Sequence, residues 1–338
     1  MIDSKDISVV VQGAIDSKYT KKCLKSIRKY LPKAEIILST WEGSNVEGLD
    51  FDVLIENKDP GTAIVSTDLL YNNVNRQLVS TQNGLKVASK KYTLKFRTDL
   101  SLKGNRFLKF FDKFLERDDK FSVFQHRVIV SSVYSREYSS TIIRIHHPKC
   151  PKGFIKCPFC VSDFYFFGLT EDLKSYFEPT ELMKTEDMSN YNFNNKEMTS
   201  PADLSFRFSA EQYYCYSFAQ RHFPTIKFND YFDWNTELCN FAKRFVYNNF
   251  IFLGFCESQI YSDKHQHSML FDSSIRGLIT YKRFIKRYRQ LFDRNYNPKE
   301  YFMNGYLLDK FKISIWRLLY RFNLNVRNYV RIIYYQYF

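Results

Sequence analysis

The sequence predicts an α/β protein built on a mostly parallel, Rossmann-type sheet with flanking helices. Over residues 1–100, short apolar runs alternate with amphipathic helical patterns in the order strand, helix, strand, strand, helix, strand. Each apolar run stops at a polar or glycine-containing segment. Strands joined through helices pair in parallel by right-handed crossovers, so these segments are expected to meet at one edge of the sheet.

The first unit is a strand, a tight turn and a helix. Residues 7–11 are apolar, and Gln12 and Gly13 follow them as the turn. A helix then begins near Asp16 or Ser17, and either side chain is suited to cap its N-terminus. The apolar face of this helix is predicted to consist of Cys23, Leu24, Ile27 and Leu31.

Two further strands are predicted before the second helix. They cover residues 35–39 and 51–55, and the polar segments that follow them contain Thr40 and Asp59. Because ligands of open α/β sheets collect beyond the carboxyl ends of the strands, we expect Thr40 and Asp59 near a bound ligand.

The second amphipathic helix is predicted over residues 72–89, with apolar side chains three and four residues apart. Its first turns are expected to expose Asn75, Arg76 and Gln77. Backbone donors and the helix dipole favour an anion at this end of a helix. The helix therefore predicts a contact with a phosphate group.

The most informative segment is the strand at residues 92–96 and the polar residues that follow it. Lys95 lies within the strand, and Arg97 and Asp99 come where the strand must stop. The pyrophosphate of a nucleotide diphosphate sugar needs positive charge, which either an arginine or a metal held by a carboxylate supplies. The alternative interpretation of Arg97 and Asp99 is a salt bridge at the end of a strand.

Several ordered segments resemble the WavE-type lipopolysaccharide-synthesis family of bacterial glycosyltransferases. The similar segments cover roughly the first two thirds of the chain. They are VVVQGAI at 9–15, SIRKYLPKAEIILSTWEG at 26–43, NKDPG at 57–61, NRQLVSTQNGL at 75–85, KFRTDL at 95–100, VSDFYFFGLTEDL at 161–173 and SAEQYYCY at 209–216.

The resemblance implies a nucleotide-sugar fold of the GT-A type and a role in building lipopolysaccharide or capsule. Many glycosyltransferases carry an Asp-x-Asp triplet whose last carboxylate corresponds to Asp99, whereas its first position is Arg97 here. Asp99 is thus the expected ligand for Mg²⁺ or Mn²⁺, with Arg97 as the alternative source of charge. The residues expected to bind the nucleotide-sugar donor are Gln12, Gly13, Thr40, Asp59, Asn75, Arg76, Lys95, Arg97 and Asp99.

Glu211 and Asp163 are the two candidates for the catalytic base that deprotonates the acceptor hydroxyl. Glu211 falls in the first turn of a helix that Ser209 is expected to cap, where the helix dipole alone also favours an acid. Asp163 lies in an otherwise apolar segment that is predicted to be a strand. A buried carboxylate there needs a partner or a chemical role, and the alternative is a position at the strand end facing water.

The cysteine and histidine pattern does not predict a closed zinc site. Cys157 and Cys160 have the spacing of a zinc knuckle, but a second pair of ligands at such a spacing does not follow. We expect these cysteines to be small buried residues among aromatic side chains. The alternative is that His146 or His147 completes a divalent metal site shared with Asp99.

Composition limits the class of protein. A chain of 338 residues with 44% apolar residues is long enough and apolar enough for one large domain and an accessory region. The predicted division is a nucleotide-sugar and acceptor domain at 1–232 and a mainly helical, basic and aromatic region at 233–338. Seven cysteines, a start without a basic leader and the lack of a long apolar run predict a cytoplasmic protein.

Positive charge is concentrated at the C-terminus. Residues 275–338 carry 14 Lys and Arg against 3 Asp and Glu, so they hold most of the chain's net charge of +14. Two amphipathic helical segments are predicted there, at 276–294 and 315–333. Their apolar faces either pack on the rest of the protein or lie on the anionic inner face of the cytoplasmic membrane. No nucleic-acid-binding signature accompanies the cations, so nucleic acid is not an expected partner.

The sequence thus predicts transfer of a sugar from a nucleotide diphosphate sugar to a lipopolysaccharide, capsule or lipid-linked glycan acceptor. Two alternatives remain open at this point. One is a noncatalytic adaptor that binds a nucleotide sugar or anionic lipid within a polysaccharide assembly complex, and the other is a transferase that moves a phosphosugar.

Overall fold

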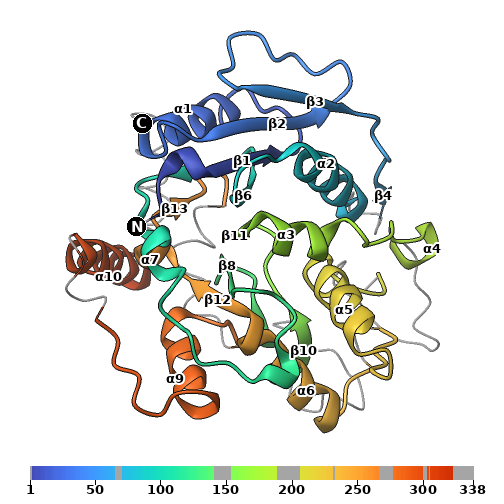
Figure 1. Ribbon diagram of the computed structural model, residues 1–338, viewed down its shortest axis with the longest axis vertical. Coiled ribbons are helices and arrows are strands. Elements are labelled where there is room, and N and C mark those ends of the chain that lie inside the picture. Colours follow the sequence, from blue (N-terminus) through green and yellow to red (C-terminus); the bar gives the residue numbers. More distant parts are fainter. Residues whose placement is uncertain are drawn as a thin grey trace.

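The computed structural model describes residues 2–64, 71–140, 154–188, 206–230, 233–265, 277–299, 303 and 305–322. A seven-stranded sheet runs through the centre of the molecule (Figure 1). Six of its strands point in one direction and only β11 runs antiparallel to its neighbours, which confirms the predicted α/β class. In spatial order the strands are β12 (Phe250–Leu253), β8 (Val128–Ser131), β11 (Tyr165–Leu169), β6 (Tyr92–Arg97), β1 (Ile7–Gln12), β2 (Glu35–Trp41) and β3 (Val53–Asn57).

Several helices pack apolar side chains against this sheet. α2 approaches β1 closely: a Cβ on Gly84 would lie 2.3 Å from the Val10 side chain, so only glycine fits there. The helices are α1 (Thr20–Tyr30), α2 (Val74–Val87), α3 (Thr170–Phe177), α4 (Thr185–Met188), α5 (Ala210–His222), α6 (Thr236–Asn249), α7 (Phe255–Ser258), α9 (Tyr281–Leu291) and α10 (Tyr306–Phe322).

Three two-stranded sheets lie outside the central one. They pair β4 (Ala63–Ile64) with β5 (Tyr71–Asn72), β9 (Arg136–Ser140) with β10 (Phe154–Cys160), and β7 (Ser101–Leu102) with β13 (Ile260–Tyr261). The last pairing brings a C-terminal segment back to the end of β6, because β7 follows β6 closely in the chain.

The prediction that Asp163 lies within a strand is wrong. Residues 161–164 form a bend between β10 and β11. Ser162 makes local bonds that compete with strand pairing: its hydroxyl accepts from the Phe164 amide (3.3 Å), and its own amide donates to the Ser135 hydroxyl (2.9 Å). Asp163 therefore lies at the entrance to β11.

The residues beyond position 232 contribute to the central sheet as well as forming helices. β12 pairs in parallel with β8, with Phe250 opposite Val128. The division at 232 stays a prediction, but the chain on its two sides shares one sheet.

The two C-terminal helices use their apolar faces differently. On α9, Tyr281, Phe284, Ile285 and Tyr288 are buried against the rest of the protein, as the packing alternative predicted. On α10, Ile315 belongs to the predicted apolar stripe and is 40% exposed. The remainder of that stripe beyond residue 322 lies outside the described residues. No helix in the described ranges has the length and apolar character needed to cross a membrane.

Candidate functional site

The candidate site is a cluster of charged side chains at the carboxyl end of β6. Arg97 is the last residue of the strand, and its guanidinium donates two hydrogen bonds to Asp99. The Nε to Oδ1 distance is 3.1 Å and the Nη2 to Oδ2 distance is 2.7 Å. Asp99 is 7% exposed, whereas the Arg97 side chain keeps 20% exposure. The predicted strand-end pair of opposite charges is therefore present.

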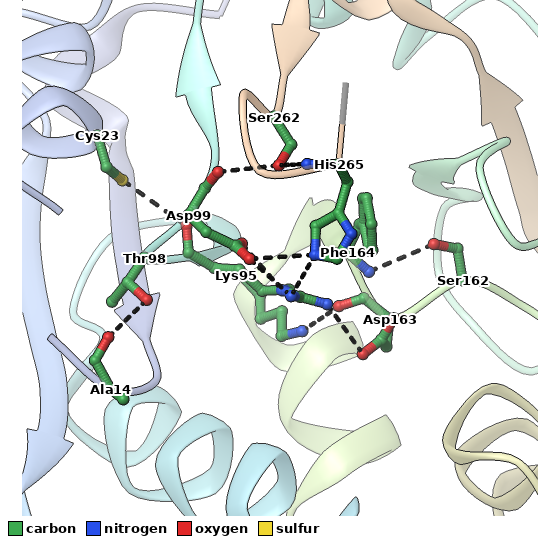
Figure 2. Close-up of polar contacts among 11 residues, drawn as sticks. Ala14, Cys23, Lys95, Thr98, Asp99, Ser162, Asp163, Phe164, Ser262 and His265 are labelled. Atoms are coloured by element: carbon green, nitrogen blue, oxygen red, sulfur yellow. Dashed lines mark hydrogen bonds and ion pairs between the residues drawn. The ribbon is translucent and has the colours of Figure 1, made fainter. Parts of the chain in front are cut away.

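Asp163 joins this cluster because β11 runs antiparallel to β6. Tyr165 lies opposite Phe96, so the chain just before Tyr165 passes Arg97 at the end of β6. The Asp163 Oδ2 atom is 3.8 Å from Arg97 Nη1. In Figure 2 the side chains of Asp99, Asp163 and His265 point toward one another.

Lys95 lies beneath the cluster. It is 1% exposed, and its ammonium donates a hydrogen bond to the backbone carbonyl of Asp163. Burial lowers the pKa of Lys95 to about 8, while the negative charge of Asp163 opposes that change. Lys95 was expected to contact the donor, but its buried position makes it a residue that fixes the Asp163 bend.

His265 was not predicted as a site residue, and it contacts both members of the Arg97–Asp99 pair. Its Nε2 atom is 3.4 Å from Asp99 Oδ2 and 3.2 Å from Arg97 Nη2. The turn after β13 places it: the Ser262 hydroxyl donates to the Asp99 carbonyl (3.1 Å) and accepts from the His265 amide (3.1 Å). The ring also packs against Phe164, with centroids 5.2 Å apart.

These contacts determine the charge state of the cluster. Burial alone would raise the pKa of Asp99, but hydrogen bonds from His265 and Arg97 outweigh it and hold the pKa well below its usual range. Burial disfavours the charged form of Arg97, and Asp99 and Asp163 reverse that effect and raise its pKa. The site therefore presents an ionised carboxylate that orients a permanent cation.

Glu211 is the third carboxylate near this cluster. It lies in the first turn of α5, whose N-cap is Ser209 as predicted, with the Ser209 hydroxyl accepting from the Gln212 amide (3.3 Å). Burial and, to a smaller extent, the negative charge of Asp163 together raise the pKa of Glu211 to about 7. Its side chain keeps intermediate exposure. Glu211 is thus a carboxyl group that exchanges its proton near neutral pH.

The turn after β1 packs directly on the segment after β6. Gly13 has a φ of 121°, and a Cβ at this position would lie 3.3 Å from the Thr98 hydroxyl oxygen. The Thr98 hydroxyl donates to the Ala14 carbonyl at 2.8 Å. Gln12 is 2% exposed, and its side-chain carbonyl accepts from the Ser80 hydroxyl of α2 (2.7 Å). Gln12 thus joins β1 to α2, while Gly13 allows the turn to approach Asp99.

Asp59 and Arg76 form a pair of their own beyond the ends of β3 and α2. Arg76 donates from Nε to Asp59 Oδ1 (2.8 Å) and from Nη2 to Asp59 Oδ2 (2.6 Å). Both side chains are about one third exposed, at 32% and 38%. Within the described part of the chain, neither side chain makes a hydrogen bond or ion pair with Asp99, so the structure has two separate charge pairs here.

Two other predicted donor contacts have internal partners. Asn75 was expected to be exposed and is buried: its side chain exchanges two hydrogen bonds of 2.8 Å with the backbone of Met183. The buried Thr40 hydroxyl lies 3.3 Å from that of Ser44. The expectation of exposure for Asn75 is wrong because the loop after α3 covers this side of the α2 N-terminus.

The arrangement does not fit a closed metal site. Arg97 hydrogen-bonds both oxygens of Asp99, and no group of three or more His, Cys, Asp or Glu able to hold a metal occurs in the part of the chain that the structure describes. Cys157 and Cys160 are buried, as expected for apolar packing residues. His146 and His147, the alternative ligands, lie outside the described residues.

A protein-family model described as WavE lipopolysaccharide synthesis matches residues 7–324, nearly the whole chain. No curated protein matches the sequence. One similar solved structure is described as the crystal structure of 4-diphosphocytidyl-2C-methyl-D-erythritol synthase from Anaerococcus prevotii DSM 20548. The identity to it is 12%, the TM-score is 0.31, and the match covers 71% of this chain and 97% of that one.

Proposed function

The chain belongs to the WavE lipopolysaccharide synthesis family, and on this basis we propose that it is a glycosyltransferase of the GT-A type. It would move a sugar from a nucleotide diphosphate sugar to a lipopolysaccharide, capsule or lipid-linked glycan acceptor. The observation that carries this proposal is the position of Arg97 at the end of β6, held between Asp99 and Asp163, with Asp163 interacting in turn with the titratable acid Glu211.

In this proposal Arg97 stabilises the leaving nucleotide. Cleavage of the glycosidic bond leaves negative charge on the pyrophosphate, and a guanidinium already fixed by Asp99 needs no reorganisation to meet that charge. His265 contacts both members of the pair and supports their orientation. Gly13 and Thr98 shape the neighbouring turn, where backbone groups of the protein would contact the donor.

Glu211 is the proposed base. In an inverting transfer, a carboxylate takes the proton of the acceptor hydroxyl while that oxygen attacks the anomeric carbon. A pKa of about 7 suits this role because such a group is a stronger base than an ordinary carboxylate and is still about half ionised at neutral pH. Asp163 is the second candidate for the base, and its interaction with Arg97 at 3.8 Å favours a supporting role.

Arg97 also fills the place in which a divalent ion would neutralise phosphate charge. Mg²⁺ or Mn²⁺ on Asp99 would require Arg97 to release at least one carboxylate oxygen. We therefore route no step through a metal and assign the neutralising charge to the guanidinium.

The exposed side of α10 supports attachment to the anionic inner leaflet of the cytoplasmic membrane. Tyr306 and Ile313 are buried on one side of the helix. Two ion pairs hold this helix in place: Asp309 with Arg106 (3.0 Å) and Lys310 with Glu257 (2.7 Å). Four large apolar side chains share the opposite side and are 40–64% exposed. They are Leu307, Leu308, Phe311 and Ile315. Together with the basic composition of residues 275–338, this face fits an anionic bilayer surface.

A panel of UDP, GDP and CMP sugars tests the proposal. The purified protein is incubated with each donor and a lipopolysaccharide or lipid-linked acceptor, and the masses of the products are measured by mass spectrometry. A mass increase equal to one sugar residue supports glycosyl transfer. An increase that contains phosphorus would identify a phosphosugar transferase, and binding without any product would favour a noncatalytic adaptor.

A further inference from the structure

A cavity of about 340 Å³ lies between β10 and α6, and neither Arg97 nor Asp99 lines it. Its walls are formed by β9, β10, the two residues before α6 (Trp234 and Asn235) and one side of α6 itself. Arg287 of α9 closes one side. A volume of this size is at the lower end of the range for small-ligand sites. It accommodates roughly one sugar unit, and no contact described for the nucleotide-sugar site uses it.

The lining of the cavity carries excess positive charge. Arg136, Lys156, Lys243 and Arg287 contribute four cations, and Glu137 is the single carboxylate. Glu137 is already bonded: Arg287 Nε lies 3.1 Å from its Oε1, and the Tyr247 hydroxyl donates to the same oxygen at 2.9 Å. The lining as a whole therefore keeps a net positive charge, which favours an anionic ligand.

The same lining offers features that suit a sugar ring. Trp234 contributes an indole whose Nε1 donor is buried and has no hydrogen-bond partner among the described residues. A buried donor without a partner costs free energy that a ligand hydroxyl would recover. Tyr138 adds a second aromatic ring, which Lys156 approaches to 5.7 Å from the centroid. An aromatic surface beside polar donors is a good match for a polyhydroxylated ring.

The cavity shares a wall with the proposed base. Arg136 and Cys160 both line the cavity and both interact electrostatically with Glu211. Pro158, another lining residue, accepts a hydrogen bond from Gln212, the neighbour of Glu211 on α5 (3.2 Å). A ligand held in the cavity thus lies on the Glu211 side of the site, where an acceptor belongs.

We propose that this cavity binds an anionic sugar unit, bearing a phosphate or a carboxylate, of the glycan acceptor. This inference rests on the proposed glycosyl transfer for its biological meaning, but binding in the cavity is measurable without any donor. Lys156 and Lys243 would hold the anionic group, and Trp234 would donate to a ring hydroxyl.

The test is a calorimetric titration with four probes: glucose 1-phosphate, glucuronic acid, glucose and inorganic phosphate. At least one of the two anionic sugars is expected to bind more tightly than both glucose and inorganic phosphate. A Lys156→Ala/Lys243→Ala double variant should raise the Kd for that sugar about tenfold or more, the loss of one to two charge-assisted contacts. Trp234→Phe, which keeps an aromatic ring and removes the N–H, should weaken binding by a smaller factor.

Cys239 provides a readout of the location. It lines the cavity with intermediate exposure, and alkylation at this residue is followed by peptide mass spectrometry. The anionic sugar should slow alkylation of Cys239 in the wild type and not in the double variant. Lys120→Ala, at an exposed lysine that does not line the cavity, is the matched control.

Three results would overturn the inference: no binding of either anionic sugar, equal binding by wild type and double variant, or inorganic phosphate binding as tightly as the sugars, which indicates a simple anion site. Nucleotide-sugar binding is titrated separately in the same variants. If the anionic sugar binds the cavity as predicted and no nucleotide sugar binds, only the proposed donor site is contradicted. If a nucleotide sugar binds and the anionic sugar does not, only the cavity proposal is contradicted.

Discussion

Arg97 donates two parallel hydrogen bonds to Asp99, at 3.1 Å and 2.7 Å, so a residue at the end of β6 has its charged group fixed by a residue two positions later. This bidentate geometry restricts the guanidinium more strongly than a single contact would. The Arg97 side chain as a whole keeps 20% exposure. The pair is a structural salt bridge, and in the proposed function it also presents positive charge to the donor.

Asp99→Asn should lower kcat for sugar transfer about 100-fold or more, because the amide no longer fixes the guanidinium that stabilises the leaving group. The measurement is steady-state transfer with a saturating donor, accompanied by thermal unfolding to establish that the variant folds. Asp50→Asn, which removes an exposed partner of Arg28, is the matched control and should leave kcat unchanged. Unaltered transfer by Asp99→Asn would refute the assigned role.

Arg97→Ala should increase the dependence of transfer on Mg²⁺ or Mn²⁺. The substitution removes the cation and frees both Asp99 oxygens, so a divalent ion gains a ligand and a function there. Activity is measured against metal concentration after treatment with a chelator. If wild type and Arg97→Ala give superimposable metal titrations, Arg97 is not the group that substitutes for a metal.

Glu211 predicts the acidic limb of the pH profile. Its ionised form is the base, so kcat/KM should rise as the pH increases through about 7. Glu211→Gln should lower kcat about 100-fold or more and leave its residual rate without this limb. Glu171→Gln, at an acid whose side chain is 73% exposed on α3, is the control. An acidic limb that persists in Glu211→Gln would assign it to another group, with Asp163 as the next candidate.

The same raised pKa makes a prediction about stability. The folded protein retains a proton on Glu211 that the unfolded chain releases, since the pKa rises from 4.5 to about 7 on folding. The contribution of Glu211 to the free energy of unfolding is therefore most favourable below 4.5 and declines as the pH rises through about 7. Relative to wild type, Glu211→Gln should gain stability over that window, as urea unfolding at several pH values will measure. A constant difference at all pH values would contradict a Glu211 carboxyl group whose pKa rises on folding.

The exposed side of α10 predicts binding to anionic vesicles. Leu308→Ser/Phe311→Ser removes two side chains that are each 64% exposed, so it should weaken vesicle binding with little change in stability. Cosedimentation with vesicles of phosphatidylglycerol and phosphatidylcholine measures the effect. Leu115→Ser, at an apolar residue that is 70% exposed elsewhere, is the control. Equal sedimentation of all three proteins, or binding that does not depend on phosphatidylglycerol, would exclude the α10 face as a membrane contact.

The sequence was sufficient for the parts of the fold that depend on local pattern. Apolar runs predicted β1, β2 and β6, and the amphipathic spacing predicted α1, α2 and α9 within a few residues. Arg97 and Asp99 were found because the end of a buried parallel strand is a position that sequence alone identifies. The place of Ser209 before Glu211 predicts a helix cap, and in the structure the Ser209 hydroxyl accepts the capping hydrogen bond from the Gln212 amide.

Other features depend on contacts between distant segments, which no local pattern encodes. His265 reaches Asp99 only because β13 pairs with β7, and each of these strands has just two residues. Its signal in the sequence was a histidine in a polar stretch, which is common on surfaces. Asn75 was misjudged because the backbone of Met183, more than a hundred positions later, satisfies its amide. The apolar residues around Asp163 predict a strand, whereas the hydrogen bonds of Ser162 that form the bend are visible only in the structure.

The central claim is that the fixed guanidinium of Arg97 binds the pyrophosphate of a nucleotide sugar. The direct measurement is a calorimetric titration of wild type and Arg97→Ala with UDP, GDP and CMP sugars. We predict that at least one of these ligands binds the wild type and that its Kd rises about tenfold or more in Arg97→Ala, the loss of a charge-assisted contact. Failure of every ligand to bind the wild type, or equal affinities for the two proteins, would contradict the claim.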